Sequence, residues 1–196
     1  MVARTLPDDA PEPFQRALVA LKSAVVRPEV VLTEAPSPGR IAPYSVALTA
    51  DVVDHGPGGE LEELATGRFV LLYDPSGPQP WDGTFRAVTF VRADLEAELG
   101  SDPMLGEVGW SWLTESLALR GAEFTHEGGT VTRVVSESFA ALADRPSGVE
   151  IEIRASWTPV TDDLSPHLCA WTDLLCTVAG LPPLPDGVTA LPSRRR

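Results

Sequence analysis

The sequence has few of the side chains on which most enzyme active sites depend. Its 196 residues include one lysine, Lys22, with three histidines and two cysteines. There is no Gly-x-x-x-x-Gly-Lys-Ser/Thr phosphate loop and no Gly-x-Ser-x-Gly nucleophile elbow. These absences disfavour lysine-based phosphate binding and serine hydrolysis, and they favour a protein that is not an enzyme.

The histidines and cysteines do not form a metal-binding pattern. His55 and His126 stand in turn-like segments, whereas His167, Cys169 and Cys176 fall within one predicted helix. A structural zinc site needs four ligands, commonly in paired short spacings, so we expect no metal and no cofactor. Two cysteines seven residues apart on a helix lie roughly 10 Å apart, too far for a disulfide. Reduced cysteines indicate a cytoplasmic protein.

The sequence also lacks long apolar runs and a positive charge balance. No stretch of 18 apolar residues exists and the N-terminus has no signal-peptide core, so no membrane span is predicted. The net charge of −13 repels phosphate backbones and anionic lipids, which excludes nucleic acid and membrane as expected partners. The one basic run, residues 194–196, is interpreted as a solvated tail. With 28 acidic residues, carboxylate pairs are too common to mark a site.

The residues that are present predict one globular domain. Apolar residues make up 43% of the chain and charged residues 22%, which are globular proportions. Apolar stripes predict helices after Pro11, between Asp102 and Gly121, and between Asp162 and Gly180. The segments between them predict strands joined by short turns, which pair antiparallel. We expect an α+β fold with one antiparallel sheet and three main helices, in the order α-β(3–4)-α-β(2–3)-α. We expect residues 11–183 to form the domain, with flexible ends at residues 1–10 and 184–196.

Three strand regions carry specific expectations. Residues 149–157 alternate between apolar and polar side chains, so one face is predicted to be buried and the other to be exposed to solvent. On the solvent-exposed face, Arg154 is expected to pair with Glu150 or Glu152, or to hold an anion. Residues 68–73 are apolar on both faces and predict a central, covered strand. Gly128-Gly129 predicts a turn between strands at 123–127 and 130–136. Residues 60–66 predict a helical turn.

Tryptophan is the most distinctive component of the sequence. Five tryptophans accompany only six phenylalanines and two tyrosines. Trp81 and Asp82 stand at the end of a proline-rich loop. Trp110 and Trp112 are two positions apart on a helix, so they point about 200° apart and do not both face the same core. Either they pack within a thick domain, or they form an aromatic binding surface or a dimer interface.

Two functional hypotheses follow from these residues. The first is a non-enzymatic protein-interaction module of the chaperone or adaptor kind, a homodimer that binds protein through the Trp110/Trp112 helix and the sheet. The second is a small-molecule site, with or without catalysis, lined by Trp81, Asp82, Arg154 and Trp157.

Several motifs in order along the chain resemble a known family. They are Trp81-Asp82-Gly83, Glu-Val-Gly-Trp-Ser-Trp-Leu at 107–113, Gly-Gly-Thr-Val-Thr at 128–132, Arg-Ala-Ser-Trp-Thr at 154–158 and Ala-Trp-Thr-Asp-Leu-Leu-Cys at 170–176. Together they resemble an actinobacterial domain-of-unknown-function family over residues 13–183. The resemblance implies a cytoplasmic protein and assigns no activity. It also implies genes near a ribonuclease D-like exonuclease and haem-synthesis genes, hence a third hypothesis of an accessory factor for RNA decay or haem synthesis.

The order of elements is also similar to the type III secretion chaperone and YbjN-like fold. Proteins of that fold are small acidic dimers that bind other proteins. The likeness is one of element order, and fold alone does not fix function.

Overall fold

The computed structural model describes residues 10–39, 41–55, 60–144 and 147–181. Within them, apolar positions recurring at helical or strand spacing form three α-helices, two short 3₁₀ helices and six strands. In chain order the elements are α1 (Glu12–Ser23), β1 (Val30–Ala35), β2 (Tyr44–His55), β3 (Leu61–Tyr73), β4 (Phe85–Leu95), η1 (Ala97–Ser101), α2 (Leu105–Leu119), β5 (Phe124–Ser136), η2 (Ala140–Leu142), β6 (Gly148–Pro159) and α3 (Ser165–Val178).

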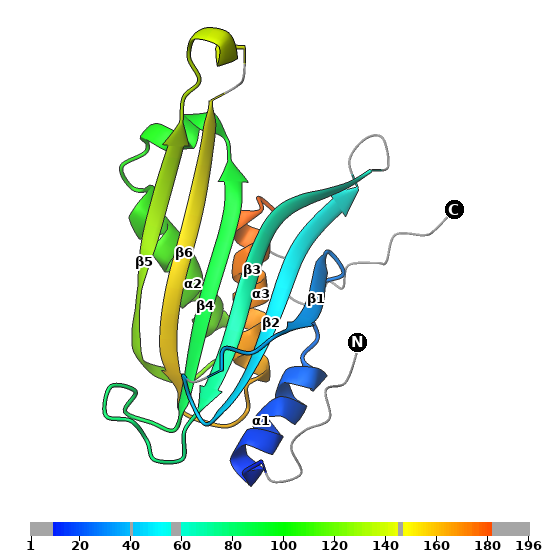
Figure 1. Ribbon diagram of the computed structural model, residues 1–196, viewed down its shortest axis with the longest axis vertical. Helices are drawn as coiled ribbons and strands as arrows, with labels where there is room; N and C mark the ends of the chain where they lie inside the picture. The colour runs from blue at the N-terminus through cyan, green and yellow to red at the C-terminus, as the bar shows by residue number, and fades with distance from the viewer. Residues whose placement is uncertain (1–9, 40, 56–59, 145–146, 182–196) are drawn as a thin grey trace.

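The six strands form one sheet in the order β1-β2-β3-β4-β6-β5, and every neighbouring pair is antiparallel. η2, which lies between β5 and β6 in the chain, stands beyond the ends of these strands (Figure 1). The α+β class, the antiparallel sheet and the three helices are therefore confirmed. Residues 68–73 belong to β3, which lies inside the sheet between β2 and β4, as predicted.

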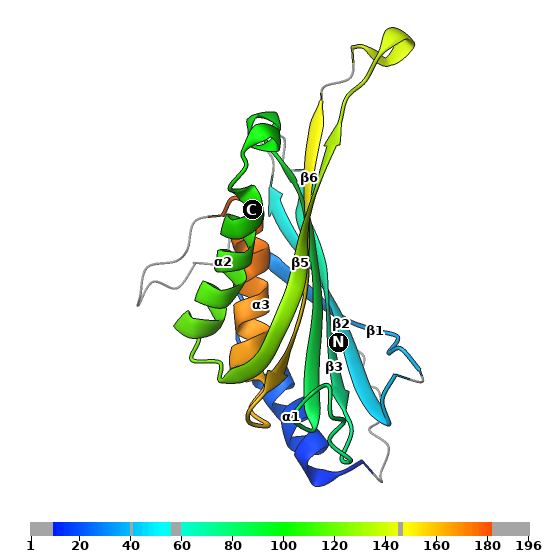
Figure 2. The same cartoon turned by 90° about the vertical axis from the view of Figure 1, so that its left-hand side faces the viewer.

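All three helices lie on the same side of the sheet (Figure 2). α3 is the middle helix of this layer because it packs against α1, α2 and three strands. Its side chains are buried on almost every side, and Trp171, Leu168 and Leu175 are fully enclosed. None of the described helices is both long and apolar enough to cross a membrane.

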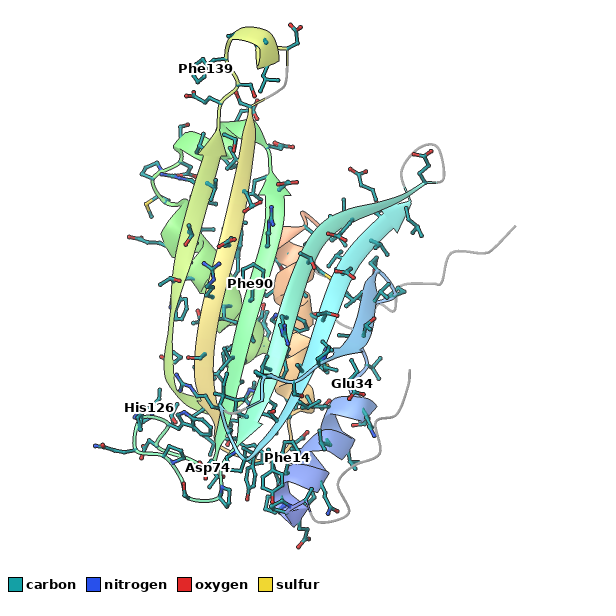
Figure 3. The ribbon with its side chains drawn as sticks, viewed as in Figure 1. Phe14, Glu34, Asp74, Phe90, His126 and Phe139 are labelled. Atoms are coloured by element: carbon teal, nitrogen blue, oxygen red, sulfur yellow. The ribbon has the colours of Figure 1, made fainter. Side chains whose placement is uncertain are left out.

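The strands alternate between the two faces of the sheet as their sequences require. On β6, Ile151, Ile153 and Trp157 point into the core beneath the helices, whereas Glu152 and Arg154 lie on the other face. We call the face without helices the open face. Figures 1 and 3 view the sheet from this side.

Two local predictions are wrong. Residues 61–66 begin β3 and do not form a helical turn. Gly128-Gly129 does not turn the chain, because both glycines lie inside the continuous strand β5, next to a bulge between Thr125 and Gly128. A Cβ on Gly129 would collide with the carbonyl of Arg154 and lie 2.7 Å from Cζ3 of Trp110. This glycine allows β6 and α2 to approach β5 closely.

Candidate functional site

Cross-strand pairing brings distant residues into two neighbouring rows on the open face. One row places Arg68 of β3, Phe90 of β4 and Arg154 of β6 side by side, ending at Thr130 of β5. An aromatic ring therefore lies between two arginines. Figure 3 shows Phe90 near the middle of this face.

The second row is smaller and apolar. Val70 of β3 pairs with Val88 of β4, which pairs with Ser156 of β6, and Gly128 of β5 completes the row. Its small side chains leave an open hollow of about 380 Å³ beside the taller arginine row. We call this hollow the open-face trough. It is lined by Arg68, Val70, Val88, Phe90, Arg154 and Ser156, with Thr130 at its β5 end.

The arginine row is positioned by an ion pair and an aromatic contact. The Arg154 guanidinium lies 5.2 Å from the centre of the Phe90 ring, which is within the range of a cation–π interaction. Nη2 of Arg154 lies 2.7 Å from Oε2 of Glu152. The predicted pairing with a neighbouring glutamate thus exists, and the arginine still remains exposed along the trough.

Two other arginines of the open face form no ion pair with a described carboxylate. Nη2 of Arg68 donates to the Pro36 carbonyl at 2.7 Å. Arg86 of β4 is half-buried and donates to Ser156, Thr158 and the His126 carbonyl. Burial lowers the pKa of the Arg86 guanidinium. These neutral acceptors leave positive charge on a protein whose net charge is −13.

A second hollow lies at the β5 start of the sheet, next to the Trp81 loop. Asp82 and His126 both adopt a left-handed backbone, with φ of 50° and 53°, and Oδ2 of Asp82 lies 3.7 Å from Nε2 of His126. Such strained conformations concentrate at functional sites. The adjoining hollow has a volume of about 660 Å³, and Asp82, Phe85, Thr125 and Thr158 are among its lining residues.

The structure separates the predicted small-molecule residues. Arg154 lies on the open face, whereas Trp157 is fully buried beneath the helices. Nε1 of Trp157 donates to Nδ1 of His167 at 3.0 Å, and burial lowers the pKa of His167 to about 4. Trp81 is half-buried against Ala47, Val70 and Leu72 on the open face, and Asp82 lies in the second hollow.

The two helix tryptophans lie at the edges of the core. Trp110 and Trp112 are both half-buried and pack against the main hydrophobic cluster. Trp110 extends over Gly129 of β5. Neither tryptophan lines the open-face trough, so the structure does not bring them together with Arg154.

No group of three His, Cys, Asp or Glu side chains in the described part of the chain could hold a metal ion. Cys169 and Cys176 are free thiols in the core. Burial raises the pKa of both, that of Cys176 to about 11. Thiols held protonated in this way are poor nucleophiles and poor metal ligands.

The sequence did not identify four of the residues that line the trough: Arg68, Val70, Val88 and Phe90. Each looks ordinary in its own strand, and only the register across β3, β4 and β6 places them together. The sequence contained one indication of an apolar patch on this face. Val88 and Phe90 are apolar residues on the face of β4 that also carries Arg86 and Arg92, where alternation calls for polar side chains.

Fold and site together define a class: a six-stranded antiparallel sheet with helices on one face and an arginine-flanked apolar trough on the other. The chain belongs to the family described as "Protein of unknown function (DUF3000)", which it matches over residues 10–189. No curated protein and no solved structure matches it.

Proposed function

We propose that this protein is a non-enzymatic protein-interaction module whose binding surface is the open face of its sheet. The observation that carries the proposal is the open-face trough, where the exposed Val88 and the half-buried Phe90 lie beside the exposed arginines Arg68 and Arg154. Apolar residues on the uncovered side of a sheet indicate a surface that another molecule covers. Aromatic and arginine side chains are also the types enriched where proteins bind one another.

Charge indicates the kind of partner. Arg68 and Arg154 line the trough, and Arg86 lies beside it, where it donates to Ser156. Arg68 and Arg86 lack a carboxylate partner among the described residues. Complementary potentials favour a partner segment that combines aliphatic or aromatic side chains with carboxylates. We therefore propose an acidic, apolar segment of another protein as the occupant of the trough.

Site-specific photo-crosslinking tests this proposal. A benzophenone amino acid replaces Val88 on the trough floor, and the matched control carries it at Val19, an exposed valine of α1. In cells of the natural host, we expect the Val88 position to crosslink one defined protein segment rich in carboxylates and apolar residues. We expect Arg68→Glu with Arg154→Glu to lower that yield at least fivefold.

Other outcomes would overturn the proposal. Identical products at Val88 and Val19 would show unspecific contact, and yields unchanged by charge reversal would remove the role of the arginines. A crosslinked segment from a second copy of this chain would make the trough an interface between copies.

The second hollow supports an alternative function, a small-molecule site at Asp82 and His126. The specific observation is that Asp82, which lines the hollow, lies 3.7 Å from His126 of a separate segment, and both residues have a left-handed backbone. Replacing each residue by glycine distinguishes a small-molecule site from a purely local backbone requirement. If the left-handed backbone serves only the Trp81 loop and the β5 bulge, Asp82→Gly and His126→Gly should raise stability slightly and change nothing else. If the hollow binds a small molecule, host metabolite fractions should quench the tryptophan fluorescence of the wild type, and both variants should lose this quenching.

A further inference from the structure

The outer edge of β5 carries an inference that goes beyond the proposed function. β5 is 13 residues long and has one neighbouring strand, β6, whereas the opposite edge strand β1 has six residues. Most β5 residues are exposed, including Val134 and Val135. A long exposed edge strand is a template for pairing with another strand.

Hydrogen bonding shows which backbone groups of β5 point outward. Thr89 of β4 donates its hydroxyl to the carbonyl of Ala155 on β6, so the backbone of Ala155 faces β4. Gly129 lies opposite Ala155 and therefore directs its own N–H and C=O away from β6. By alternation, Val131, Arg133 and Val135 also direct their backbone groups to the outer edge.

The charged residues of β5 are complementary to those of a second, antiparallel copy of β5. Glu127 and Arg133 are its only acidic and basic residues apart from His126, and they stand three positions on either side of Thr130. Two copies of β5 paired antiparallel about Thr130 place each Glu127 opposite Arg133 of the other copy. In this register Gly129 faces Val131 of the second copy, so two outward-facing backbones meet and can exchange hydrogen bonds.

Centring on Val131 places Arg133 opposite Gly129, and centring on Thr132 places Glu127 opposite Glu137. Centring on Gly128 places Arg133 opposite Glu123, but Glu123 lies outside β5 and this register leaves Glu127 opposite Gly129. We propose that the protein forms a homodimer by antiparallel pairing of β5 with β5 of a second copy, centred on Thr130. The two-fold axis is perpendicular to the sheet, so both open faces lie on the same side.

Exposed apolar residues at the two ends of the strand fit the same arrangement. Phe139, on the protruding hairpin tip (Figure 3), is 72% exposed, and Leu119 at the end of α2 is 85% exposed. Phe139 follows the end of β5 and Leu119 precedes its start, so antiparallel pairing brings the hairpin tip of one copy towards the end of α2 of the other. The hairpin tip would then cover the end of the second copy's α2.

Disulfide trapping tests the register. In a pair centred on Thr130, the two Thr130 Cα atoms lie about 4.5 Å apart, which a disulfide can span. Thr132→Cys is the matched control, because the two copies of this position lie four residues apart along the pair. We expect Thr130→Cys to form a covalent dimer on oxidation at least tenfold faster than Thr132→Cys. The native cysteines are buried and should not interfere.

A charge exchange tests the interface independently of any disulfide. Arg133→Glu should weaken dimerisation at least tenfold in sedimentation equilibrium, and Glu127→Arg combined with Arg133→Glu should restore it. Thermal melts of each variant report on folding, since Arg133 also donates to the Asp102 carbonyl. A monomeric wild type, preferential crosslinking at Thr132→Cys, or no rescue by the double variant would overturn the proposal. None of these outcomes depends on what the trough binds.

Discussion

The covered and open faces of the sheet are built from the same strands but have opposite character. Beneath the helices, Ile151, Ile153 and Trp157 of β6 are at most 1% exposed. One residue away on the same strand, Glu152 and Arg154 lie at the surface. The backbone is therefore shared, and only the direction of alternate side chains separates a core from a binding surface.

The difference shows where stability and recognition can be changed separately. The covered face excludes water and fills space, so its residues should govern folding. The open face carries arginines and, at Val88 and Phe90, apolar side chains that remain partly exposed, so these residues should govern binding. Substitutions at matched positions on the two faces test this division.

The largest difference is expected between two aromatic residues. Trp157→Ala removes a fully buried side chain and the hydrogen bond that His167 accepts from it. It should cost about 3–5 kcal/mol in the free energy of unfolding. Phe90→Ala on the open face should cost less than about 1.5 kcal/mol, because Phe90 is only half-buried. Urea denaturation of both variants measures this, and equal losses would contradict the division of roles.

Two adjacent glycines provide the next comparison. A Cβ on Gly129 would meet the Arg154 carbonyl and Trp110, whereas a Cβ on Gly128 meets nothing within 4 Å. We expect Gly129→Ala to destabilise the protein by about 2–3 kcal/mol through overpacking, and Gly128→Ala to change stability by less than about 1 kcal/mol. Thermal unfolding of the pair is the measurement. A tolerated Gly129→Ala would mean that both the β6 backbone at Arg154 and Trp110 of α2 can move away from β5.

These glycines also show why part of the fold could not be predicted. Gly-Gly between apolar segments favours a turn, and nothing in the local sequence reveals that β6 and Trp110 approach the chain there. By contrast, the alternation at 149–157 and the stripe of α3 depend only on neighbouring residues, and both were predicted correctly. The open-face trough could not be predicted, because Arg68, Val88 and Arg154 meet only through the register of three strands.

The covered face should also make stability depend on pH through His167. Burial lowers its pKa in the folded protein to about 4, below the ordinary 6.5. The unfolded chain therefore binds a proton at higher pH than the folded protein does, and stability falls as pH drops from about 6.5 towards 4. We expect a loss of about 2 kcal/mol between pH 7 and pH 5.

His167→Gln separates this contribution from others. The variant should be less stable at pH 7, since Trp157 loses its imidazole acceptor, but it should lose less stability on acidification. His126→Gln, the same substitution at an exposed histidine, is the matched control. Urea midpoints at pH 5, 6 and 7 give the comparison, and an unchanged slope in His167→Gln would show that other groups cause the acid sensitivity.

The smallest effect is expected on the open face, where Glu152 pairs with Arg154. More than half of the Arg154 side chain is exposed, so solvent and salt screen the pair. Glu152→Gln should therefore change the free energy of unfolding by less than about 1 kcal/mol, and 0.5 M NaCl should remove most of the difference. Chemical denaturation at low and high salt measures both. A loss above about 2 kcal/mol would mean that the arginine row stabilises the fold, and the argument that its charge is available to a partner would fail.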